Sequence, residues 1–154
     1  MKKVTSRYAL ILFSLFIIIE SCSKSNTVPT QTASVNPSSV VVSGTWGISS
    51  LSQRDEDKTS SFTGYTFTFT SAGSLQAEKS GAVTTGTWSY TPSAVSYYGS
   101  TPSKASITIN LGASKPFSQL TRIWNVDSVN TNASRLALIS PEVAEDMHLN
   151  FSKN

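Results

Sequence analysis

Strict alternation of aromatic and polar side chains over residues 65–70 is the feature that most constrains how this chain can fold. Tyr65, Phe67 and Phe69 alternate with three threonines. Successive side chains of a β-strand point to opposite faces, so the stretch predicts a strand with one aromatic, buried face. Such alternation is typical of antiparallel sheets that bury one side.

Shorter runs of the same kind, separated by turn residues, continue to the end of the sequence. We expect eight strands, at residues 40–51, 62–70, 75–79, 83–90, 103–111, 122–126, 136–140 and 146–152. Around the start of the sixth strand, Phe117, Leu120, Ile123 and Trp124 fit one helical turn, whereas residues 122–126 could equally be strand. We interpret the stretch as a short turn followed by strand. Eight strands with mostly short connections predict an all-β, eight-stranded antiparallel up-and-down barrel, whose closure removes exposed edges. We expect a monomer.

The N-terminus has the pattern of an export signal. Lys2, Lys3 and Arg7 precede an apolar run over residues 8–19 that only Ser14 interrupts. A helix that crosses a bilayer needs about 20 residues, so this run has the length of the hydrophobic region of a signal peptide. We therefore expect residues 1–21 to be removed on export.

The residues at the end of this run, Ile19, Glu20, Ser21 and Cys22, resemble the lipobox of bacterial lipoproteins. That resemblance implies a diacylglyceryl group on the thiol of Cys22, with cleavage after the small Ser21, and two or three acyl chains hold a protein firmly in a membrane. An ordinary signal peptide with an incidental cysteine is the alternative. Because Cys22 is the only cysteine, we expect no internal disulfide.

Residues 22–39 are rich in serine, threonine, asparagine, glutamine and proline, a composition that predicts a flexible tether. In some lipoproteins, acidic residues just after the cysteine direct export to the cell surface. Residues 23–26 contain none. The pattern therefore favours an outer membrane, with the domain lipid-anchored on its periplasmic face.

The charge of the mature chain argues against nucleic acid as a partner. From Lys24 onward there are nine lysines and arginines against eight aspartates and glutamates, a net charge of +1. Binding to phosphates requires clustered cations.

The first predicted strand carries Gly44, Thr45 and Trp46, which resembles the G-x-W signature near the start of lipocalins, and Gly86, Thr87 and Trp88 repeat it in the fourth. The resemblance spans residues 43–152 and implies a lipocalin-like domain at 40–154, in which the tryptophan plugs the closed end of the barrel. An arginine usually covers that tryptophan, and Arg122 and Arg135 are both candidates. A glycine beside a tryptophan also has a structural explanation, since it lets a bulky neighbour pack against the backbone. The chain lacks the T-D-Y motif of the family and its cysteine pair.

Residue patterns that carry catalysis or metal binding are missing. His148 is the only histidine, and alternation with Met147 and Leu149 predicts that it faces solvent. The acidic cluster of residues 55–57 lacks the spacing of a calcium loop and is interpreted as a solvated connection. We expect no enzymatic activity, no cofactor and no metal site.

A short motif, Asp127-Ser128-Val129, matches an acceptor pattern for O-glycosylation at Ser128. Aspartate and serine that simply share a turn are the alternative explanation.

The leading functional hypothesis is a barrel that holds a small apolar ligand. Core packing explains the same aromatic side chains equally well. The competing hypothesis is a structural or protein–protein interaction module that meets another envelope protein through loops 52–61 and 91–104. The residues predicted to line a ligand cavity are Tyr65, Phe67, Phe69, Trp88, Tyr90 and Trp124.

Overall fold

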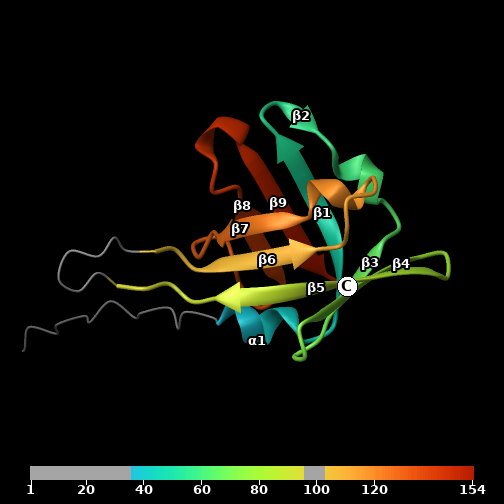
Figure 1. Cartoon of the computed structure of the whole chain (residues 1–154), viewed down its shortest axis with the longest axis horizontal. Coiled ribbons are helices and arrows are strands. Elements are labelled where there is room, and N and C mark those ends of the chain that lie inside the picture. Colours follow the sequence, from blue (N-terminus) through green and yellow to red (C-terminus); the bar gives the residue numbers. More distant parts are fainter. Residues whose placement is uncertain (1–35, 96–102) are drawn as a thin grey trace, which may run out of the picture. The chain divides into compact units, whose positions relative to one another are not determined.

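The computed structural model describes residues 36–95 and 103–154 (Figure 1). They form one short α-helix, nine strands and three 3-10 turns. In chain order these are α1 (Pro37–Val41), β1 (Thr45–Gln53), β2 (Glu56–Asp57), η1 (Thr59–Phe62), β3 (Thr66–Phe69), β4 (Ser74–Lys79), β5 (Ala82–Thr91), β6 (Ser106–Asn110), η2 (Phe117–Gln119), β7 (Arg122–Val126), β8 (Arg135–Ile139), η3 (Val143–Glu145) and β9 (Met147–Lys153).

Eight of the strands close into an antiparallel barrel, which confirms the predicted fold class. From β3 to β9 each strand pairs with the next, and β1 pairs with β3 on one side and β9 on the other. The β1–β9 pairing runs from Trp46 opposite Lys153 to Gln53 opposite Met147. The extra strand, β2, pairs only with the end of β1. Two seams are short, because β1–β3 and β7–β8 each have two residue pairs in register.

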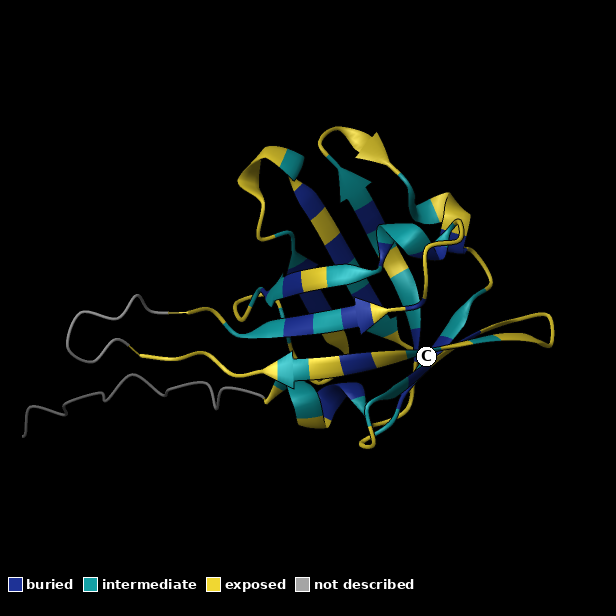
Figure 2. Cartoon of the chain, viewed as in Figure 1, coloured by how far each residue is buried: buried dark blue, intermediate teal, exposed yellow. Residues whose placement is uncertain are grey.

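Aromatic side chains fill the interior of the barrel, and buried residues alternate with exposed ones along its strands (Figure 2). The ring of Phe151 meets Phe67 edge-on at 5.4 Å between centroids and Phe69 at 5.7 Å. Phe69 also meets Trp88 at 5.5 Å. Edge-to-face pairs at these distances are favourable beyond the burial of their area. The core therefore continues from β3 across to β9 and β5.

The two ends of the barrel differ. Strands β1, β4, β6 and β8 begin at one end of the barrel, and β3, β5, β7 and β9 finish there. We call this the tether end, because the chain enters the domain there at Asn36. Helix α1 packs at this end through the buried Val40 and Val41, and Figure 1 shows it beside β5. The opposite end, the far end, is filled by Phe62 of η1 and Phe117 of η2.

Gly86 shows why a glycine precedes the tryptophan of β5. Its Cα lies against the backbone of β6, and a Cβ built there would overlap the carbonyl oxygen of Asn110 and lie 2.9 Å from the carbonyl carbon. Thr87 pairs with that same Asn110. Only glycine allows the two strands to approach so closely.

Several predicted boundaries are wrong in detail. Residues 40 and 41 are helical, not strand, and β1 begins at Thr45. The helix starts inside the predicted tether because Asn36 caps it, accepting a hydrogen bond from the amide of Ser38 at 3.1 Å, and Pro37 suits the first helical position. The second predicted strand begins late, at Thr66, because Phe62 ends η1 and Gly64 turns with a φ of +82°. The turn predicted before the sixth strand is present as η2.

Candidate functional site

The six aromatic residues proposed as ligand contacts divide into two groups. Phe67, Phe69, Trp88 and Trp124 are buried within the core, where Trp88 and Trp124 donate their indole N–H groups to the carbonyls of Thr70 and Leu120 at 2.9 and 3.0 Å. Tyr65 and Tyr90 are half-buried against that core, at opposite ends of the barrel. Tyr65 lies edge-on to Phe117 at 5.3 Å, at the far end. Tyr90 belongs to the tether end.

Tyr90 lines a pocket of about 330 Å³ at the tether end. Tyr90 comes from the end of β5, Ala105 from just before β6, Val126 from the end of β7 and Pro37 from α1. Four polar residues complete the lining: Asn36, Ser93, Ser128 and Thr131. The pocket is thus a mixed apolar and hydroxyl-lined hollow where α1 meets the ends of three consecutive strands.

A second hollow of about 480 Å³ adjoins the first. Both are lined by Ser93, Ala105, Val126 and Ser128, and the second continues to Lys104 and Ile139. Its walls include the charged side chains of Lys104 and Asp127, and it continues the pocket beside Tyr90. Residues 96–102 of loop 91–104, the loop that the competing hypothesis assigns to contact with another envelope protein, lie outside the described residues.

The motif at Ser128 lies on the rim of both hollows. Ser128 is exposed, and Val129 is 90% exposed. The carboxylate of Asp127 accepts hydrogen bonds from the side-chain amide of Asn130 at 2.7 Å and the backbone amide of Val129 at 3.1 Å. The bond from Asn130 is the main reason that the pKa of Asp127 lies below its usual value. This aspartate therefore organises the turn that presents Ser128 to solvent.

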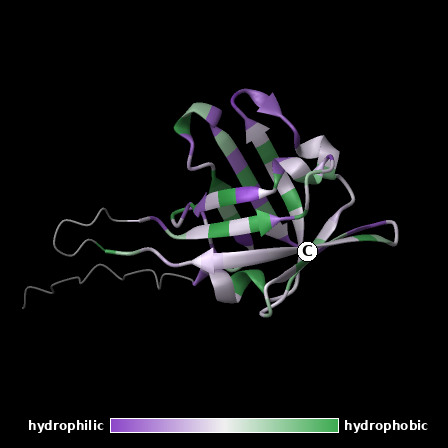
Figure 3. Cartoon of the chain, viewed as in Figure 1, coloured by the Kyte–Doolittle hydropathy of each residue, from purple (hydrophilic) through white to green (hydrophobic). Residues whose placement is uncertain are grey.

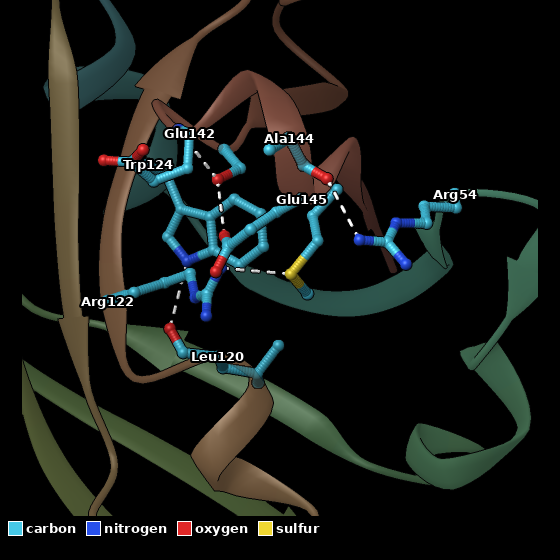
Figure 4. A network of polar contacts seen from close by, with 9 residues as sticks. Arg54, Leu120, Arg122, Trp124, Glu142, Ala144 and Glu145 are labelled. Atoms are coloured by element: carbon cyan, nitrogen blue, oxygen red, sulfur yellow. Dashed lines mark hydrogen bonds and ion pairs between the residues drawn. The ribbon is translucent and has the colours of Figure 1, made fainter.

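A polar network at the far end was not visible in the sequence (Figure 4). The guanidinium of Arg122 donates to Glu145 and, at 3.1 Å, to the sulfur of Met147, while the hydroxyl of Ser140 donates to Glu145 at 2.8 Å. Arg54 adds a bond to the carbonyl of Ala144 at 3.4 Å. Together these bonds fasten η3 to the barrel. Their partners lie as far as 90 residues apart in sequence, so no local pattern could have indicated them.

The two arginines proposed to cover the plug tryptophan contact other residues. Arg122 lies 5.6 Å above the ring of Trp124, and Arg135 donates to the side chain of Asn150 at 3.0 Å. Trp46, the tryptophan of the signature, is fully buried and donates to the carbonyl of Val41. Residues of α1, rather than an arginine, thus provide the polar partner of Trp46.

The remaining candidates lie on the surface of the far end. His148 is exposed, with Nε2 3.2 Å from a carboxylate oxygen of Asp146. Residues 56 and 57 are exposed on β2, where Glu56 pairs with Lys58 at 2.9 Å and Asp57 accepts a bond from the amide of Thr59.

Within residues 36–95 and 103–154, no group of three or more histidine, cysteine or acidic side chains is placed to hold a metal ion. In the same part of the chain, no helix has the length and apolar character needed to span a bilayer.

Residues 19, 21 and 22, which carry the lipobox, lie outside the described residues. The sequence matches no family model, and no curated protein or solved structure is significantly similar to it. The resemblance to lipocalins therefore rests on the signature around Trp46, and what the structure adds to it is the closed eight-stranded barrel.

Proposed function

We propose that this protein is a lipid-anchored lipoprotein of the bacterial outer membrane, and that its barrel binds a small apolar ligand at the tether end. The pocket beside Tyr90 carries the proposal. Its volume of about 330 Å³ lies in the range of ordinary small-molecule sites, which combine apolar walls with a few polar groups. Tyr90, Ala105 and Val126 supply the apolar wall, and hydroxyl groups at the rim orient the ligand.

The packing of the interior favours a ligand site at the mouth of the barrel. The ring of Phe151 contacts the rings of Phe67 and Phe69, so the centre of the barrel is occupied by side chains. Packed interiors contain few voids larger than a water molecule. The ligand therefore binds at the mouth of the barrel rather than deep within it.

Two tyrosines provide a matched test of this site. We expect Tyr90→Ala to weaken binding of a polarity-sensitive apolar fluorophore by about tenfold, since it removes a large contact from the wall. Tyr65→Ala removes the same side chain at the far end and leaves the affinity unchanged. Equal losses in the two variants, or none in either, refute the assignment of the pocket.

Native mass spectrometry of the protein extracted from its own membrane tests the anchor and the ligand together. The expected species begins at Cys22, carries a diacylglyceryl group and releases a small apolar molecule on activation. A chain that retains residues 1–21, or an unmodified Cys22, overturns the anchor. The same spectrum reports any sugar on Ser128.

The filled interior also favours the second candidate, an interaction module of the envelope. In that case the loop with β2, where Glu56 and Asp57 are exposed, contacts another protein. Cross-linking in intact cells from position 56 then captures one defined partner, and the fluorophore binds neither the parent protein nor Tyr90→Ala.

A further inference from the structure

Charged side chains are distributed unequally between the two ends of the barrel. The tether end has three exposed cations, Lys104, Arg135 and Lys153, against one carboxylate, Asp127, which gives a side-chain net charge of +2. Lys24 is the only charged residue in the segment that leads from Cys22 to Asn36.

The far end is acidic. Its seven carboxylates are those of Asp55, Glu56, Asp57, Glu78, Glu142, Glu145 and Asp146. Five cations, Arg54, Lys58, Lys79, Lys115 and Arg122, leave a net charge of −2. Figure 3 shows the hydrophilic character of β2 at this end. The described part of the chain is therefore neutral as a whole but carries opposite charges at its two ends.

From this asymmetry we infer that the tether end of the barrel rests on the surface of an anionic phospholipid bilayer, with the acidic far end directed away from it. The inference depends on the proposed anchor at Cys22. It adds which surface of the domain meets the membrane and which kind of lipid that surface contacts. An anionic surface attracts basic residues close to it and repels carboxylates within about a Debye length. The Tyr90 pocket then opens toward the lipid.

The length of the anchoring segment is compatible with this orientation. Thirteen residues lie between Cys22 and Asn36, so the segment can span at most about 50 Å. If the far end faced the lipid, the segment would have to run back along the barrel, which is about 24 Å long judged from the seven residues of β9. Contact through the tether end requires no such path.

Exposed apolar side chains do not decide between the two ends, because both have them. Val95 and Val129 are 71% and 90% exposed at the tether end, and Val143 is 91% exposed at the far end. On the inferred orientation, Val129 lies at the depth of the headgroups while Val143 stays in water. These two valines, equal in size and exposure, give a matched pair for measurement.

The experiment uses the mature chain with Cys22→Ser and a hexahistidine at its N-terminus, held on vesicles that contain a nickel-chelating lipid. Anchoring is then independent of natural lipidation, so failure of the orientation and failure of the proposed anchor are separate results. One introduced cysteine, Val129→Cys or Val143→Cys, carries a fluorophore, and headgroup-labelled nitroxide lipids quench it according to its proximity. The other lipid is phosphatidylglycerol or phosphatidylcholine.

On phosphatidylglycerol we expect strong quenching at position 129 and little at position 143. This difference is smaller on phosphatidylcholine. It is also smaller on phosphatidylglycerol in 0.5 M salt, roughly where screening limits charge interactions to short distances. Lys104→Ala lowers, by about fivefold, the ratio of molecules with the tether end on the lipid to molecules with the far end on it. Lys115→Ala, an exposed lysine at the far end, does not lower it. Equal quenching at the two positions, or quenching that ignores lipid charge and salt, overturns the inference.

Discussion

The indole N–H of Trp46 donates a hydrogen bond to the backbone carbonyl of Val41 over 2.8 Å, and both residues are fully buried. The bond joins the last residue of α1 to the second residue of β1. It closes a tight connection in which the chain enters the domain, makes one short helix and begins the barrel. The tryptophan of the Gly44–Thr45–Trp46 signature thus holds α1 at the tether end, where α1 forms one wall of the Tyr90 pocket.

Trp46→Phe keeps a ring in the core but removes the donor. We expect the free energy of unfolding to fall by about 1–3 kcal/mol, because the carbonyl of Val41 is left buried without its partner. Urea denaturation measures the change. Val129→Ala, at a surface valine, serves as the control and changes stability by less than about 0.5 kcal/mol. An equal, negligible effect in both variants means that the indole bond does not hold α1.

Gly86→Ala tests the close approach of β5 and β6. The added Cβ overlaps the carbonyl of Asn110, so the strands must separate, and we expect a loss of about 3 kcal/mol in urea denaturation. Gly81→Ala provides the comparison, since Gly81 also resists substitution, with a φ of +83°, but has no atom within 4 Å of the new methyl. Gly81→Ala lowers the free energy of unfolding by about 1 kcal/mol, from backbone strain alone. A smaller loss at Gly86 than at Gly81 contradicts the steric explanation.

Much of the barrel was predictable because its inward residues repeat every second position. The strand that contains Phe67 and Phe69 was recognised by that period, and so were the strands of Ile107 and Leu149. Helix α1 was missed because Val40, Val41 and Val42 favour strand by themselves. What makes the segment helical is the cap at Asn36 and the burial of two valines beneath Trp46, and the second of these is tertiary.

The candidate pocket was predictable only in part. Tyr90 was named among the aromatic residues expected to line the barrel, but Ala105, Val126 and Pro37 have no chemical property that marks them in the sequence. They meet only because strand ends and α1 converge at one end of the barrel. The ion pair of Arg122 with Glu145 was missed for the same reason, since 23 residues separate its partners.

Acid is expected to loosen η3. The hydroxyl of Ser140 and then the guanidinium of Arg122 stabilise the charged form of Glu145, which holds its pKa below the ordinary 4.5. A carboxyl with a lowered pKa in the folded state contributes stability above its unfolded value, and that contribution is lost as the pH falls through the folded value. Glu145→Gln therefore makes the loss of stability below pH 4.5 less steep than in the parent protein.

Urea midpoints across a pH series measure this slope. Ser140→Ala removes the largest cause of the lowered pKa of Glu145 and flattens the slope in part. Val143→Ala, in the same turn but 91% exposed, leaves it as in the parent protein. If Glu145→Gln retains the full acid sensitivity, the bonds that fasten η3 do not depend on the charge of Glu145.

Phe67→Ala tests whether the centre of the barrel is filled by side chains. Phe67 is fully buried and its ring contacts Phe151, so its removal leaves a cavity with apolar walls and costs about 3–5 kcal/mol. Apolar cavities of this kind stay dry and bind small molecules such as benzene or xenon. We therefore expect benzene to raise the Tm of Phe67→Ala and to leave that of the parent protein unchanged. A rise in the parent protein requires an interior void that already accepts ligand, and it would move the proposed binding site from the mouth at Tyr90 to the centre of the barrel.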